Sequence, residues 1–238
     1  MKKFLFIFLL WQSFSPAQNI KTELTYSVFS ANAATKGKPL LVVMHGFGAN
    51  ENDLFDLAKK VAPQCVIVSL RAPIQVSPNG FCWYNIERLP AKQLKYDYAH
   101  VAESRNKVQS FISQFCKSTL ADSNNIYLMG FSQGAMMSYE LLLKSNVNIK
   151  GILALSGRLI NESYTPPLKV KNLKQKNIFL AHGTSDEIID FSEFTKASAF
   201  FTQQGVTQLA LKTYPIGHTI GNDEVSDIKN WLASLLKP

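Results

Sequence analysis

The pentapeptide Gly130-Phe131-Ser132-Gln133-Gly134 is the part of the sequence best suited to nucleophilic chemistry. It matches the G-x-S-x-G pattern, in which a serine stands on a strained turn between a strand and a helix. The context fits, because the apolar run 125–129 has the character of a buried strand and helical spacing begins at Gly134. The flanking glycines leave room for the helix to fold back over the strand. We predict that Ser132 is a nucleophile; an inert serine in a glycine turn is the alternative.

A serine hydroxyl needs a base to remove its proton, and histidine is the usual base. In sites of this type the residues follow the order Ser, Asp, His along the chain. Of the four histidines, only His218 lies in a loop after a late strand, at the edge where open sheets place ligands. We therefore predict His218 as the base. His45 and His182 are expected to shape neighbouring loops, and His100 to be a surface or packing residue.

The acid must orient the imidazole and stabilise its protonated form. Asp186 comes just after an expected strand, 178–181, which places it at the same edge of the sheet as Ser132. Glu187 and Asp190 are competing candidates, and Asp190 could instead fix its own loop. Asp223 is expected at the start of the last helix, where a carboxylate favours the helix dipole. We predict Asp186 as the acid.

Acyl transfer also needs two N–H donors for the charge that develops on the carbonyl oxygen. The residue after the serine supplies one, and the loop after an early strand supplies the other. These are Gln133 and the loop 45–48, His-Gly-Phe-Gly, whose glycines allow a tight turn. Phe47 is the predicted second donor.

Strand-like and helix-like segments alternate along the chain, which predicts an α/β fold with a mostly parallel central sheet flanked by helices on both faces. Such a sheet would carry the catalytic residues at the carboxyl ends of its strands. Two long Pro-containing connections, 71–96 and 157–177, are expected to form walls or lids of a site. The expected strands are 24–29, 40–44, 66–70, 125–129, 152–155, 178–181 and 209–214, and the expected helices are 51–61, 97–115, 134–143, 191–201 and 223–236.

The first 17 residues have the three parts of a secretory signal peptide: a basic head, an apolar run over 4–11 and small residues near Ala17. The run is shorter than the roughly 20 residues of a membrane span, so no stable anchor is predicted. We expect cleavage after Ala17, export to the periplasm or the extracellular medium, and a single domain over 18–238. An uncleaved apolar terminus is the alternative.

The chain is 46% hydrophobic and 18% charged, as in a compact globular protein. Its formal net charge is +8, and Lys169, Lys171, Lys174 and Lys176 crowd one probable loop. No aromatic residues interleave these lysines as in a single-stranded nucleic-acid platform, so nucleic-acid binding is not predicted. Weak attraction to an anionic membrane surface stays open.

The three cysteines, Cys65, Cys82 and Cys116, match neither a metal knuckle nor a CxxC redox pair. Cys65 is expected to fill the core, and one disulfide among the three is possible. We predict no metal and no cofactor.

Seven short segments occur in order: 45–48 (HGFG), 71–73 (RAP), 83–84 (WY), 130–135 (GFSQGA), 155–157 (LSG), 182–186 (HGTSD) and 217–218 (GH). Together they resemble the phospholipase/carboxylesterase family, which includes the acyl-protein thioesterases. The resemblance covers about residue 38 to the end. It implies an α/β-hydrolase fold and hydrolysis of carboxylic esters or thioesters without a cofactor. It also implies that the connection 71–96 lines the acyl site with Trp83 near the substrate, although Trp83 could equally be a loop anchor.

Export would separate the protein from acylated cytosolic proteins. We therefore expect a serine carboxylesterase that acts on small esters or thioesters through an acyl-enzyme. A serine peptidase on the same scaffold is the first alternative, and a secreted binding protein without catalysis is the second.

Overall fold

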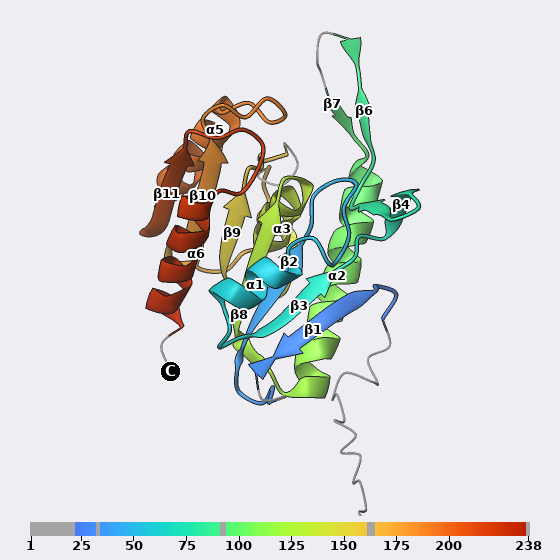
Figure 1. The fold of residues 1–238 in the computed structure, drawn as a ribbon, viewed down its shortest axis with the longest axis vertical. Helices are drawn as coiled ribbons and strands as arrows, with labels where there is room; N and C mark the ends of the chain where they lie inside the picture. The colour runs from blue at the N-terminus through green and yellow to red at the C-terminus, as the bar shows by residue number, and fades with distance from the viewer. Residues whose placement is uncertain (1–21, 32–33, 91–93, 161–164, 237–238) are drawn as a thin grey trace, which may run out of the picture.

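The computed structural model describes residues 22–31, 34–90, 94–160 and 165–236. Its centre is a seven-stranded sheet in the order β1-β3-β2-β8-β9-β10-β11 (Figure 1). Strand β1 pairs with β3 in the antiparallel direction, and the other neighbours pair in parallel. The predicted mostly parallel sheet is confirmed. The strands are β1 (Tyr26–Ser30), β2 (Pro39–Met44), β3 (Val66–Leu70), β8 (Asp122–Phe131), β9 (Ile149–Leu155), β10 (Asn177–Gly183) and β11 (Gln208–Tyr214).

Helices cover both faces of this sheet, because its central strands carry apolar side chains alternately to each side. In β2, Leu40 and Val42 pack on one face, whereas Leu41 and Val43 pack on the other. The first face is covered by α2 (Tyr98–Thr119), α3 (Gln133–Lys144) and α5 (Ser192–Gln203). The second is covered by α1 (Phe55–Val61) and α6 (Asn222–Leu235), which lie in front of the strands in Figure 1.

The connection 71–96, expected as a wall or lid, contains two small hairpins that its sequence pattern did not predict. They are β4 (Ile74–Ser77) with β5 (Gly80–Cys82), and β6 (Ile86–Arg88) with β7 (Leu94–Tyr96). The second hairpin projects from the body of the molecule (Figure 1). The connection 157–177 contains one short 3-10 helix, η3 (Leu173–Gln175).

Side-chain contacts are seen near the starts of helices α2 and α1. Helix α2 begins after Asp97, whose carboxylate accepts a hydrogen bond from the backbone N–H of His100 at 3.0 Å. Helix α1 was expected from residue 51 but begins at Phe55. Residues 51–54 form hydrogen-bonded turns instead, and the buried Glu51 is bound to Arg71.

The predicted signal peptide, residues 1–17, lies outside the described residues. Within the described ranges, no helix is both long and apolar enough to cross a membrane. The thiols of Cys65, Cys82 and Cys116 are free and buried. Burial raises the pKa of Cys65 to about 12, so this thiol is protonated at neutral pH.

Helix α6 carries a buried carboxyl group in its first turn. Glu224 is 1% exposed, and its Oε1 has no hydrogen-bond partner among the described residues. Burial raises its pKa to about 7, a nearby Asp227 adds to the rise, and the Gly221 N–H opposes it. Between pH 4.5 and about 7, the folded state therefore holds a proton on Glu224 that the unfolded chain, with a glutamate pKa near 4.5, has released.

We expect Glu224→Gln to stabilise the protein at pH 8 but not at pH 4. Burial of the ionised group costs nothing below pH about 4.5, and the cost grows until the pH passes about 7. The full cost is on the order of 3 kcal/mol, which corresponds to roughly 6–12 °C in Tm. Thermal unfolding across this pH range measures it. Asp223→Asn, in the exposed part of the same turn, is the control, and equal gains in both variants would contradict the expectation.

Candidate active site

Ser132 lies where the central strand β8 ends and helix α3 begins. Its backbone has φ 53° and ψ −116°, a conformation that costs a residue with a side chain free energy. A Cβ on Gly134 would collide with the carbonyl oxygens of Met44 and His45, and a Cβ on Gly130 would collide with the Gly134 carbonyl. The predicted strained strand-to-helix turn is therefore present, and glycines are required on both sides of it.

The base and acid candidates lie beside this serine although they are far from it in sequence. His218 Nε2 is 2.9 Å from Ser132 Oγ, and His218 Nδ1 is 2.7 Å from Asp186 Oδ2. An ionised carboxylate can only accept, so Nδ1 carries the proton and donates it to Asp186. Nε2 is then left to accept the hydrogen bond of the Ser132 hydroxyl. The ring of Phe131 packs against the imidazole with the ring centres 4.8 Å apart.

The carboxylate of Asp186 is held by more groups than His218 alone. Its Oδ1 accepts hydrogen bonds from the backbone N–H groups of Ile188 and Ile189, each at 2.9 Å. Burial is the largest influence on its pKa and would raise it. The hydrogen bonds from His218, Ile189 and Ile188 outweigh burial together, so the pKa of Asp186 lies below its usual value. The group is therefore ionised and oriented at neutral pH.

His182 supports this loop, as expected for a residue that shapes its neighbourhood. Its Nε2 donates a hydrogen bond to the Ile189 carbonyl at 2.8 Å and lies 3.4 Å from Asp186 Oδ2. The imidazole thus ties the strand end to the turn that presents Asp186.

The competing candidates lie elsewhere. Asp190 accepts a hydrogen bond from Ser192 N–H at 2.9 Å and so fixes the start of α5. Glu187 is exposed, and Asp223 stands in the first turn of α6 as expected. His100 lies 3.1 Å from Asp97, in the first turn of α2. Among the candidates for nucleophile, base and acid, the structure brings together Ser132, His218 and Asp186.

The loop 45–48 borders the serine. A Cβ on Gly46 would lie 3.4 Å from Ser132 Cβ, and Gly48 has φ 81°, where a side chain would be strained. The loop is fixed to the β4–β5 hairpin, because Gly48 N–H donates to the Phe81 carbonyl at 2.8 Å. Among the described residues, the N–H groups of Phe47 and Gln133 donate no backbone hydrogen bond. Both stay free for a ligand, as an oxyanion site requires.

His45 fixes the start of this loop from the inside. Its Nε2 accepts from Ala72 N–H at 3.0 Å, so Nδ1 carries the proton and donates to the Gly46 carbonyl at 2.7 Å. Burial lowers the pKa of His45, which favours this neutral form. The expectation of a loop-shaping histidine is confirmed.

Trp83 is completely buried, with no exposed surface. Its indole N–H donates to the His45 carbonyl at 2.9 Å, and its backbone N–H donates to Gln133 Oε1 at 2.8 Å. Gln133 Nε2 in turn donates to the Tyr84 carbonyl at 2.7 Å. Of the two roles considered for Trp83, these contacts favour the loop anchor over substrate contact. The clamp made by the Gln133 side chain was not predicted, because the motif only assigned its backbone N–H.

An ion pair between Arg71 and Glu51 lies next to the 45–48 loop. Arg71 Nε donates to Glu51 Oε2 at 2.6 Å, and the guanidinium lies over the Phe81 ring at 4.7 Å. The hydrogen bond from Arg71 is the main cause that lowers the pKa of Glu51. The pair joins the segment after the 45–48 loop to the connection 71–96. Arg71 was singled out in the sequence, but its partner was not.

The described residues include no group of three or more His, Cys, Asp or Glu side chains placed to hold a metal ion. The chemistry that the observed groups can carry out is proton transfer between Ser132 and His218, with Asp186 orienting the ring.

The sequence of this chain is similar to those of known proteins. The model of the phospholipase/carboxylesterase family matches residues 27–236. The chain is 25% identical over 230 residues to acyl-protein thioesterase 1 of Debaryomyces hansenii, covering 91% of this chain and 99% of that protein. It is 29% identical over 158 residues to carboxylesterase SOBER1 of Arabidopsis thaliana, covering 65% and 68%.

Solved structures share the fold. A Bacillus cereus carboxylesterase superposes with a TM-score of 0.76 at 22% identity, covering 90% of this chain and 95% of that one. The esterase PE8 gives the same TM-score at 23% identity, covering 90% and 99%. At these identities the likeness shows the α/β-hydrolase fold.

Proposed function

The chain belongs to the phospholipase/carboxylesterase family and is a hydrolase of carboxylic esters or thioesters, and from that premise we propose that Ser132, His218 and Asp186 carry out its reaction through an acyl-enzyme. The observation that carries the proposal is the chain of two hydrogen bonds, 2.9 Å and 2.7 Å long, from the serine through the imidazole to the carboxylate. Each group lies within the reach that proton transfer needs.

In the first step His218 Nε2 takes the Ser132 proton while Oγ attacks the carbonyl carbon. The carbonyl oxygen becomes negative and accepts hydrogen bonds from the N–H groups of Phe47 and Gln133. When the C–O or C–S bond breaks, the leaving alcohol or thiol takes the proton from His218. The acyl group is then an ester of Ser132.

In the second step water replaces the leaving group. His218 takes a proton from the water, whose oxygen attacks the acyl carbon. Collapse of the intermediate returns the proton to Ser132 Oγ and releases the carboxylic acid. Asp186 stays ionised throughout and stabilises the imidazolium that forms in each step.

Exposed apolar side chains near Ser132 and Asp186 favour a substrate with an apolar acyl or alcohol group. Phe47 is 54% exposed and Ile188 is 59% exposed. The first belongs to the loop beside Ser132, and the second follows the acid. Removal of such side chains from water by a bound acyl or alcohol group is favourable.

We expect the purified protein to hydrolyse p-nitrophenyl esters and an acyl thioester, and not to cleave a peptide p-nitroanilide. A series of acyl chains from acetate to decanoate measures kcat/KM and identifies the preferred length. Preferential cleavage of the anilide would favour the serine peptidase instead. A fluorophosphonate probe separates both enzymes from a binding protein, because only an activated serine reacts with it.

We also propose that the protein is exported and acts on small esters outside the cytosol. The basic, apolar and small-residue parts of residues 1–17 support this. The name acyl-protein thioesterase, which several relatives carry, favours acylated proteins as the second candidate substrate. Recovery of the native protein in the cytosol with Met1 to Ala17 retained would contradict export.

A further inference from the structure

A pocket of about 640 Å³ lies at the end of the sheet opposite the catalytic serine. Asn124, Ile149 and Lys176 line it and mark the amino ends of β8, β9 and β10. Ser132 and Asp186 follow the carboxyl ends of β8 and β10. The proposed reaction therefore does not use this pocket.

The lining of the pocket is cationic. It contains Lys150, Lys169, Lys171 and Lys176, together with five amide side chains, and none of its described lining residues is acidic. No carboxylate oxygen of the described residues lies within salt-bridge distance of any of these four lysines. Three of these lysines belong to the basic loop that stands out in the sequence, and the fold adds Lys150 from β9.

Lys176 is the central group, because it is 8% exposed and a buried ammonium needs compensation. Its Nζ lies 3.3 Å from Asn148 Oδ1, a neutral oxygen that gives a weak bond at that distance. Burial, and then the charge of Lys150, lower the pKa of Lys176. Nothing near this ammonium in the described structure balances its charge, and a bound anion would do so.

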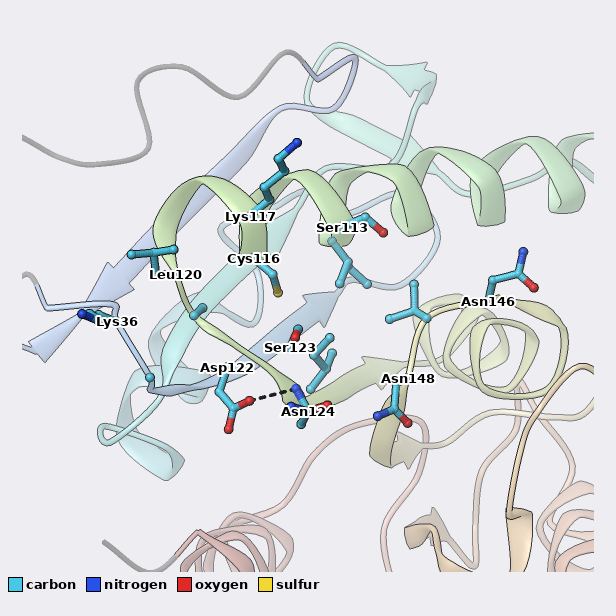
Figure 2. Close-up of a pocket in the computed structure, with 15 residues that line it drawn as sticks. Lys36, Ser113, Cys116, Lys117, Leu120, Asp122, Ser123, Asn124, Asn146 and Asn148 are labelled. Carbon is cyan, nitrogen blue, oxygen red and sulfur yellow. Dashed lines mark hydrogen bonds between the residues drawn. The ribbon is translucent and has the colours of Figure 1, made fainter.

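A second pocket, of about 770 Å³, adjoins the first, and Figure 2 shows the residues that line it. The two share Asn124, Asn146, Val147 and Asn148, and the second adds Lys36 and Lys117. Its lining also includes Asp122, whose Oδ1 accepts from Asn124 N–H at 2.9 Å and whose Oδ2 accepts from the Asn125 amide at 2.5 Å. The second pocket therefore holds a carboxylate beside its two lysines, and the lining without a carboxylate is confined to the first pocket.

We propose that the four-lysine pocket binds a phosphate-bearing anion, either free in solution or as the headgroup of a lipid. Ammonium groups and amide N–H donors that converge on one space suit the several acceptor oxygens of a phosphate. Four lysines without a carboxylate suit a ligand with more than one negative charge.

Calorimetric titration of the full protein with sodium pyrophosphate at constant ionic strength tests free phosphate. Sedimentation with phosphatidylcholine vesicles, with and without phosphatidic acid, tests the lipid source. We expect Lys176→Met to weaken binding at least about tenfold, because one charge-assisted hydrogen bond to the anion is lost. Lys150→Met is a second variant with an exposed side chain. Lys229→Met, on α6, is the matched control and should bind as the wild type does.

Pyrophosphate binding that Lys176→Met and Lys150→Met weaken and Lys229→Met does not supports the proposal with a free ligand. The same pattern for vesicles containing phosphatidic acid, without pyrophosphate binding, supports it with a lipid ligand. Binding in neither assay, or equal losses in all three variants, would overturn it. Lys176→Met should fold, because it removes an uncompensated buried charge, and its Tm checks this.

Discussion

Replacing Ser132 with alanine is expected to lower kcat for p-nitrophenyl acetate by about 10⁴-fold or more. The variant keeps the proposed oxyanion donors and the His218–Asp186 pair but has no oxygen that can form the acyl-enzyme. It should also lose labelling by a fluorophosphonate. Steady-state kinetics and gel fluorescence of the labelled protein measure the two effects.

The control for this variant is Ser185→Ala, an exposed serine at the same edge of the sheet. It should keep wild-type turnover and labelling. Unchanged hydrolysis in Ser132→Ala would reject Ser132 as the nucleophile. The Tm of Ser132→Ala should not fall, because its backbone conformation suits alanine no worse than serine.

Replacing Asp186 with asparagine is expected to lower kcat by about 10⁴-fold while the fold stays intact, the magnitude known for the equivalent change in a serine protease. The reason lies in the two N–H groups of Ile188 and Ile189, which require an oxygen at the Oδ1 position. The asparagine nitrogen must then face His218 Nδ1 and donate to it. The imidazole proton moves to Nε2, which can no longer accept the proton of Ser132.

Asp190→Asn tests the same chemistry on a competing carboxylate that contacts Ser192 and not the imidazole. It should retain activity within a few-fold of the wild type. An Asp186→Asn variant with at least a tenth of wild-type kcat would show that this carboxylate does not orient the base. Its Tm, compared with that of the wild type, separates loss of chemistry from loss of structure.

Much of the fold, and the proximity of Ser132, Asp186 and His218, could be predicted from the sequence, since their signals are local. Runs such as 40–44 are apolar on both faces, as is typical of a strand inside a covered sheet. The serine motif fixes a strand end and a helix start together. Once the strands are placed, Asp186 and His218 follow from their positions just after late strands.

The parts that were missed depend on contacts between distant segments. The β4–β5 hairpin is held partly by the pairing of Ala49 with Phe81, and neither segment alone has a strong strand pattern. The Glu51–Arg71 pair joins residues 20 positions apart. The Gln133 clamp on Trp83 and Tyr84 joins residues about 50 positions apart. No periodicity within a single segment reports such contacts.

The proposed nucleophile and its two partners follow different strands of one sheet, so the proposed catalysis depends on strand register. Ser132 follows β8, Asp186 follows β10 and His218 follows β11, so three successive pairings, β8 with β9, β9 with β10 and β10 with β11, set their alignment. A slip of one residue in any pairing would displace the partners by about 3.3 Å along the strand. That exceeds the 2.9 Å between His218 and Ser132. If these three residues carry out the reaction, turnover requires β8, β9, β10 and β11 to pair in their native register.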